Sequence, residues 1–163
     1  MNTHEVLKYG HLWVHKHLDG LTEAQMLAPN VCGWWSVKDI LAHLASFEWL
    51  LVEVFQTCVE PGPTPTLDQH NSLTGDAFNA MQVGLRKEKS PAEVLAEYDQ
   101  AYEQGMRLLP RIPATQLRQA GTIPWYGMEY SLEDFVVYQY YGHKREHCAQ
   151  IAAFRDDLMR KDV

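Results

Sequence analysis

Cysteine and long apolar runs are both scarce in this chain of 163 residues. The three cysteines, Cys32, Cys58 and Cys148, are odd in number and show no Cys-x-x-Cys spacing, which argues against a disulfide framework. The longest apolar run, residues 49–52, ends at Glu53 and is far too short to cross a bilayer. The chain does not start with a basic segment followed by an apolar one, so we expect no signal peptide and a cytoplasmic protein.

Basic residues are also few. The chain has 14 lysines and arginines against 21 acidic residues, a net charge of −7. A nucleic-acid partner favours a basic face, so the charge argues against one, and we expect a small-molecule partner instead. The length predicts a single domain, residues 1–163, which can bury a sizeable core without disulfides or structural metals.

No alternation of period two persists anywhere in the sequence, whereas apolar positions recur at helical spacing. Helices are expected at residues 2–18, 36–58, 76–88, 91–109 and 131–160, with a short helical turn at 22–26. Residues 60–75 carry three prolines and are expected to form one long loop, and residues 110–130 are expected to be irregular. The predicted class is all-α: a four-helix bundle of the up-down type with one long connection and a short extra helix.

Two histidines, His143 and His147, lie four residues apart in the last expected helix. At about 100° per residue both imidazoles emerge on the apolar face of that helix, with Val136, Tyr140 and Ile151. Buried imidazoles need partners for their nitrogen atoms, and a divalent metal ion satisfies neutral imidazole. The spacing therefore makes this pair a candidate for metal ligands.

A third histidine, His43, lies at the edge of the apolar stripe of the second long helix. If the two helices pack together, His43, His143 and His147 converge in the interior. Three protein ligands with a vacant position are typical of a catalytic zinc site. The alternative is three core histidines hydrogen-bonded to carbonyl or carboxylate groups.

Other polar groups near these positions are weaker candidates. Glu48 lies on the inner flank of the second long helix and is the candidate for a general base or for an outer partner of a ligand. His4, His11 and His15 share one flank of the first helix, which we interpret as partly solvated, with a second metal site as the alternative.

Two stretches resemble motifs of the DinB-like (YfiT-like) metalloenzyme superfamily. Gly33-Trp-Trp-Ser-Val-Lys-Asp-Ile-Leu-Ala-His-Leu-Ala45 resembles its second-helix motif, and Phe47-Glu48 stands where that family often has Trp-Glu. His143-Lys-Arg-Glu-His-Cys-Ala-Gln-Ile151 is similar to the last-helix motif His-Tyr-Arg-Glu-His-x-x-Gln-Ile, with Lys144 in the place of Tyr.

The resemblance implies a four-helix bundle whose divalent metal ion, Zn²⁺ or Ni²⁺, is held by His43, His143 and His147, and a frequent homodimer. It also implies a metal-dependent transferase of low-molecular-weight thiols, because the family includes transferases that use mycothiol or bacillithiol. A metal-dependent hydrolase or isomerase, or a non-catalytic module that binds metal or a small ligand, remain as alternatives.

Overall fold

The computed structural model describes residues 2–161, and over this range the chain is all-helical. Extended pairing within that range is limited to an isolated bridge between Cys32 and Trp35. The four long helices are α1 (Thr3–Leu18), α3 (Val37–Val59), α6 (Pro91–Leu108) and α9 (His143–Lys161). The all-α class is thus confirmed.

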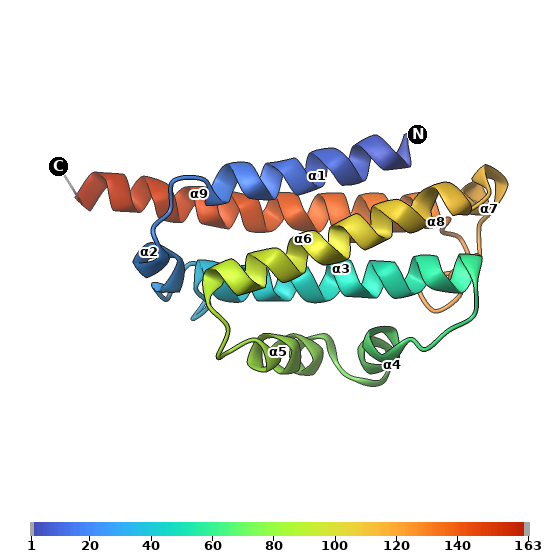
Figure 1. Ribbon diagram of the computed structural model, residues 1–163, viewed down its shortest axis with the longest axis horizontal. Helices are drawn as coiled ribbons and strands as arrows, with labels where there is room; N and C mark the ends of the chain where they lie inside the picture. The colour runs from blue at the N-terminus through green and yellow to red at the C-terminus, as the bar shows by residue number, and fades with distance from the viewer. Residues whose placement is uncertain (1, 162–163) are drawn as a thin grey trace.

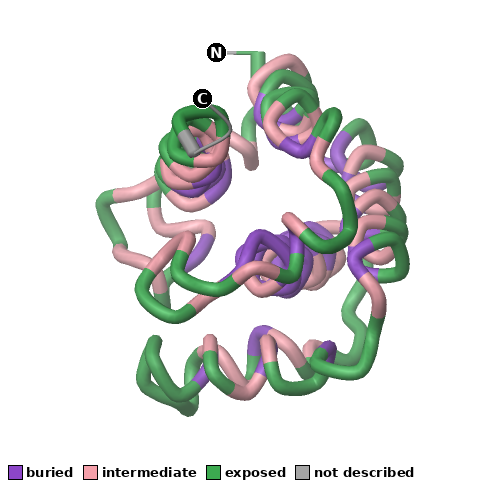
Figure 2. Tube along the Cα trace, turned by 90° about the vertical axis from the view of Figure 1, so that its left-hand side faces the viewer, coloured by how far each residue is buried: buried purple, intermediate pink, exposed green. Residues whose placement is uncertain are grey.

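The long helices lie side by side along the long axis of the molecule (Figure 1). Helix α3 packs along α6, and α1 packs along α9. Helices α4 (Pro65–Ser72) and α5 (Gly75–Leu85) form a further layer against α3, on the side opposite α1 and α9 (Figure 1). Helix α3 is therefore covered on several sides, and its trace is the most continuously buried one in Figure 2.

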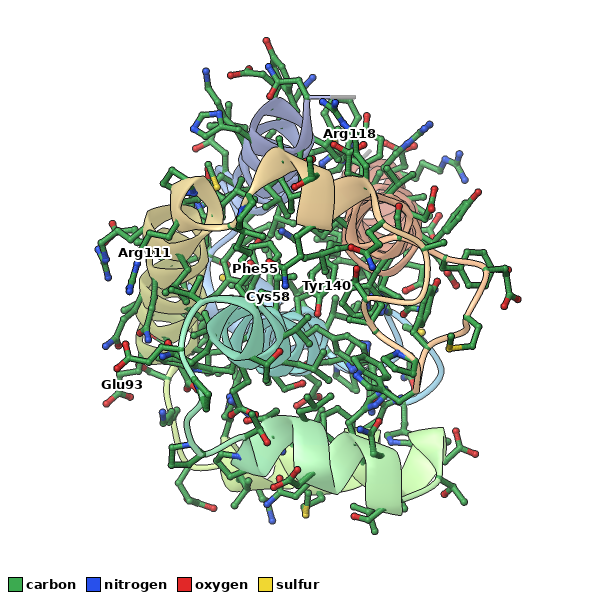
Figure 3. All side chains as sticks on the ribbon, turned by 90° about the vertical axis from the view of Figure 1, so that its right-hand side faces the viewer. Phe55, Cys58, Glu93, Arg111, Arg118 and Tyr140 are labelled. Atoms are coloured by element: carbon green, nitrogen blue, oxygen red, sulfur yellow. The ribbon has the colours of Figure 1, made fainter. Side chains whose placement is uncertain are left out.

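Helix α3 begins where its sequence predicts. Ser36 and Asp39 form a capping box, in which the Ser36 backbone N–H donates to the Asp39 carboxylate at 2.9 Å. From there apolar residues recur on every side, and Phe55 points into the interior toward Tyr140 of the last helical segment (Figure 3). This rigid, buried helix carries His43 and Glu48.

The long loop expected at residues 60–75 is wrong in its central part, which forms helix α4. Thr64, at its N-terminus, makes no capping hydrogen bond of its own. Instead the Glu53 carboxylate of α3 accepts the backbone N–H groups of Thr66 at 3.1 Å and Leu67 at 2.8 Å. A cap supplied from another helix leaves no signal in the local sequence. The three prolines therefore led to the prediction of a loop.

The last expected helix, residues 131–160, begins where the sequence predicts, at a capping box of Ser131 and Asp134, but is not a regular α-helix throughout. A short helix α8 (Leu132–Phe135) leads into η2 (Val136–Gly142), a π-helical segment, and only then into α9. Hydrogen bonds of the i→i+5 type place an extra residue in the turn, and such segments are frequent at functional sites. Helix α9 starts at His143, so η2 sets the rotation of both its histidines about the helix axis.

The remaining elements agree largely with the expected ranges. Helix α2 (Glu23–Leu27) matches the expected turn, and α5 and α6 match their expected ranges closely. The stretch expected to be irregular contains a 3₁₀ turn, η1 (Leu109–Arg111), and helix α7 (Ala114–Arg118). Of the helices within residues 2–161, none is both long and apolar enough to span a membrane.

Candidate metal centre

Helices α3 and α9 bring His43, His143 and His147 together. The Nε2 atom of His143 lies 2.8 Å from Nε2 of His43 and 2.9 Å from Nε2 of His147. His43 and His147 are buried, with 3% and 6% of their surface exposed, whereas His143 is half-buried. The three rings therefore point one nitrogen each at a common position that is open toward His143.

Groups outside the cluster lie beside each of the three rings. His147 Nδ1 donates to the side-chain oxygen of Gln150 at 2.8 Å. The backbone of Gln139 lies beside His143. The Asn79 side chain of α5 lies beside His43, but His43 Nδ1 and Asn79 Oδ1 make no hydrogen bond. A partner such as Gln150 fixes the tautomer and the orientation of a metal-binding imidazole, so the Nε2 lone pair of His147 faces the common position.

Burial keeps all three imidazoles neutral. It lowers the pKa of His43 from 6.5 to about 2 and that of His143 to about 3, and in both cases the neighbouring histidines lower it further. Burial also lowers the pKa of His147, against opposing effects of Gln150 and Glu146. Neutral imidazole is the form that binds metal ions.

These residues fit a divalent ion. Nε2 of His143 lies so close to Nε2 of His43 and of His147 that a proton or a cation must lie between each pair of atoms. A neutral imidazole with its proton on Nε2 supplies that proton in the metal-free protein, and metal binding displaces it. Zn²⁺ and Ni²⁺ accept nitrogen ligands of this kind. Among the described residues no cysteine, aspartate or glutamate joins the group, so the protein offers three ligands.

Aromatic rings enclose the cluster. The Trp35 ring lies 5.1 Å from that of His43, and the Phe47 ring lies 4.9 Å from that of His43 and 4.7 Å from that of His143. Trp35 and Asn79 also line a groove of about 820 Å³ between the 32–35 turn and α5. Cys32, Trp34, Asp39, Asp76 and Lys87 complete much of its wall. A ligand in this groove would lie one side chain away from His43.

Glu48 does not join the histidine group. Its Oε1 lies 2.6 Å from Nζ of Lys144, and both side chains are only 2% exposed. The alignment of these atoms is poor for a hydrogen bond, so the contact is an ion pair. Lys144 follows His143 directly, and its ammonium also lies over the Tyr98 ring at 5.5 Å. Both roles expected of Glu48, general base and outer partner of a ligand, stay predictions.

Gln150, Asn79 and His70 were not predicted as contributors to the centre. Gln150 had a usable signal, since it lies three residues after His147 on the same helix. Asn79 had none, because it comes from a different helix. His70 of α4 and Trp125 lie 6.0 Å apart, and His70 lies 6.1 Å from Phe47, so they border the His143 side of the centre.

A family model described as the DinB superfamily matches residues 14–151. The chain belongs to the DinB superfamily. The matched range contains all three histidines of the cluster, and a divalent metal ion bound there agrees with this membership. The DinB match begins after His11, so that residue lies outside it. Searches of curated proteins and of solved structures return no match.

Proposed function

We propose that this DinB-superfamily protein is a metal-dependent transferase, built as a four-helix bundle, that joins a low-molecular-weight thiol to an electrophilic small molecule. The observation that carries the proposal is the three-histidine group, in which Nε2 of the half-buried His143 lies 2.8 Å from Nε2 of His43 and 2.9 Å from Nε2 of His147. Three protein ligands with an open position support catalysis, whereas a fourth protein ligand would favour a structural site.

The protein's own groups hold the centre. His43, His143 and His147 would bind the ion through Nε2, while Gln150 keeps the proton of His147 on Nδ1 and Asn79 lies beside His43. Trp35 and Phe47 exclude water from the ring edges. A divalent ion supplies positive charge that lowers the pKa of a thiol at the open position.

The surroundings favour thiol over water as the nucleophile. A hydrolase usually benefits from a general base beside the nucleophilic water. Within residues 2–161 no carboxylate accompanies the three histidines, and Glu48 is paired with Lys144. A thiol needs no such base: its S–H proton passes to solvent, and the sulfur electron pair forms the new S–C bond. The leaving group then departs with its own bonding pair.

Two further assignments belong to this proposal. The groove beside Trp35 and Asn79 has room for one of the two substrates. Glu48 acts as an outer partner and not as the base, because its ion pair with Lys144 anchors the turn of α9 that carries His143. Residues 1–163 form one domain, and the protein functions in the cytoplasm as a homodimer.

The test is a panel of low-molecular-weight thiols and simple electrophiles with the fully metallated protein. We expect conjugation that is lost in His43→Ala and retained in His4→Ala, a control that removes an exposed histidine of α1. The rate should depend only weakly on pH above neutrality, since the thiol is already deprotonated. Hydrolysis of esters or amides without added thiol would contradict the transferase and indicate a hydrolase. No turnover at full metal occupancy would contradict any catalytic role and indicate a binding protein.

A further inference from the structure

A second group of potential ligands lies between α1 and α6, apart from the three-histidine cluster. His11 and His15 are one turn apart on α1, and Asp99 faces them from α6. His15 Nε2 lies 2.7 Å from Asp99 Oδ1, and His11 Nε2 lies 3.5 Å from the same oxygen. His4, the third histidine of this flank, contacts Glu5 instead and does not join them.

We propose that His11, His15 and Asp99 form a second metal centre for a divalent first-row transition ion such as Zn²⁺. Two imidazole nitrogens and one carboxylate oxygen are a donor set that such ions accept. Bonds of about 2.0–2.1 Å in tetrahedral geometry place ligand atoms about 3.3 Å apart. The two distances from Asp99 Oδ1 fall on either side of this value, so a small adjustment accommodates the ion.

The environment of His11 is the strongest support. Its ring stacks on that of Tyr102, with centroids 3.7 Å apart and planes 7° apart, so its orientation is fixed. Its side chain is only 13% exposed, so its Nε2 is held in place beside Asp99. The separation of Nε2 from Asp99, 3.5 Å, is too long for a good hydrogen bond but suits two ligands of one ion.

Charge and access also suit a cation. Burial, with the charges of Lys144 and His15, lowers the pKa of His11 to about 3, so the ring is neutral. Asp99 supplies a negative charge, and the positive charge of Lys144 is paired with Glu48. The side chains of His15 and Asp99 are 38% and 36% exposed, which leaves a route for the ion and room for water ligands.

Calorimetric titration of metal-free protein with Zn²⁺ tests this centre, because it counts the ions bound per chain. Equilibrium dialysis gives an independent count by separating bound from free zinc. We expect two ions per chain in the wild type, one in His15→Ala, one in His147→Ala and none in the double variant. Asp99→Asn, which keeps the side-chain volume, should weaken the second ion at least tenfold. His4→Ala should still bind two ions, which distinguishes this centre from non-specific binding by an exposed histidine.

A second measurement does not depend on the three-histidine cluster or on any activity. In the His147→Ala background, added Zn²⁺ should raise the melting temperature, and that rise should vanish when His15 is also replaced by Ala. Two bound ions that survive both His15→Ala and Asp99→Asn would overturn the second centre. So would a single ion in the wild type that disappears in His147→Ala. Failure of the proposed function would instead appear as no conjugation by protein with both ions bound.

Discussion

Single side chains decide whether the three-histidine centre can form. The i,i+4 spacing predicted that His143 and His147 share a helix face, and His43 was predicted to join them if the two helices pack together, as they do. The sequence could not predict Asn79, because its position beside His43 depends on how α5 packs against α3. Spacing within a helix is visible in a sequence, whereas a polar contact between helices is not.

The neutral state of the buried histidines predicts a pH dependence for the metal-free protein. The pKa values of His43 and His143 are about 2 and about 3 in the folded state, against 6.5 in the unfolded chain. The unfolded chain therefore binds more protons than the folded protein between pH 6.5 and about 3. The free energy of unfolding falls as the pH drops through this window, on the order of 2 kcal/mol per histidine between pH 7 and 5.

Urea unfolding of metal-free protein at pH 7, 6 and 5 measures this dependence. In His43→Leu the free energy of unfolding should depend less steeply on pH, because one of the buried imidazoles is gone. In His4→Ala the pH dependence should equal that of the wild type. Equal slopes in His43→Leu and the wild type would show that His43 does not titrate differently in the two states.

The ion pair of Glu48 and Lys144 predicts strong coupling between two buried side chains. Glu48→Ala should cost about 3–5 kcal/mol of unfolding free energy, because it leaves a buried ammonium without its partner. Replacing both residues, as Glu48→Ala with Lys144→Met, should recover most of that loss, and Lys144→Met alone completes the cycle. Additive single and double changes in a double-mutant cycle would mean that the two charges do not interact.

Among the helices, those with a local capping signal were predicted and those without one were not. The capping boxes at Ser36, Ser90 and Ser131 mark three helix starts that the sequence placed correctly. Helix α4 and the π-helical segment η2 were missed. The first depends on Glu53 from another helix, and the second on a hydrogen-bond register that leaves no pattern of its own.

The cap supplied by Glu53 can be tested at the level of one helix. Glu53→Ala should cost about 1–2 kcal/mol and loosen the first turn of α4, because the N–H groups of Thr66 and Leu67 lose their acceptor. Hydrogen exchange should quicken at α4 amides and stay unchanged in α1. Glu60→Ala is the matched control, because Glu60 is exposed and lies directly after the C-terminus of α3. Equal hydrogen-exchange rates of the α4 amides in the two variants would contradict the cap.

For the molecule as a whole, the homodimer stays a prediction. Helix α1 exposes Tyr9, Leu12 and Trp13, whose exposed fractions are 59%, 50% and 41%. An apolar surface of this kind on one helix is suited to self-association. Sedimentation velocity at micromolar concentration should show a dimer that Leu12→Ser with Trp13→Ser converts to monomer. A monomeric wild type across that range would rule out this assembly.

The proposed chemistry depends on a metal ion at the three-histidine cluster. The most direct measurement is elemental analysis of protein purified without a polyhistidine tag or a nickel column, with wild type, His43→Ala and His4→Ala handled in parallel. We expect His43→Ala to hold about one divalent ion per chain fewer than the wild type, and His4→Ala to match the wild type, because His43 contributes a ligand atom to the cluster and His4 does not. Equal metal content in His43→Ala and the wild type would contradict the centre and the function proposed for it.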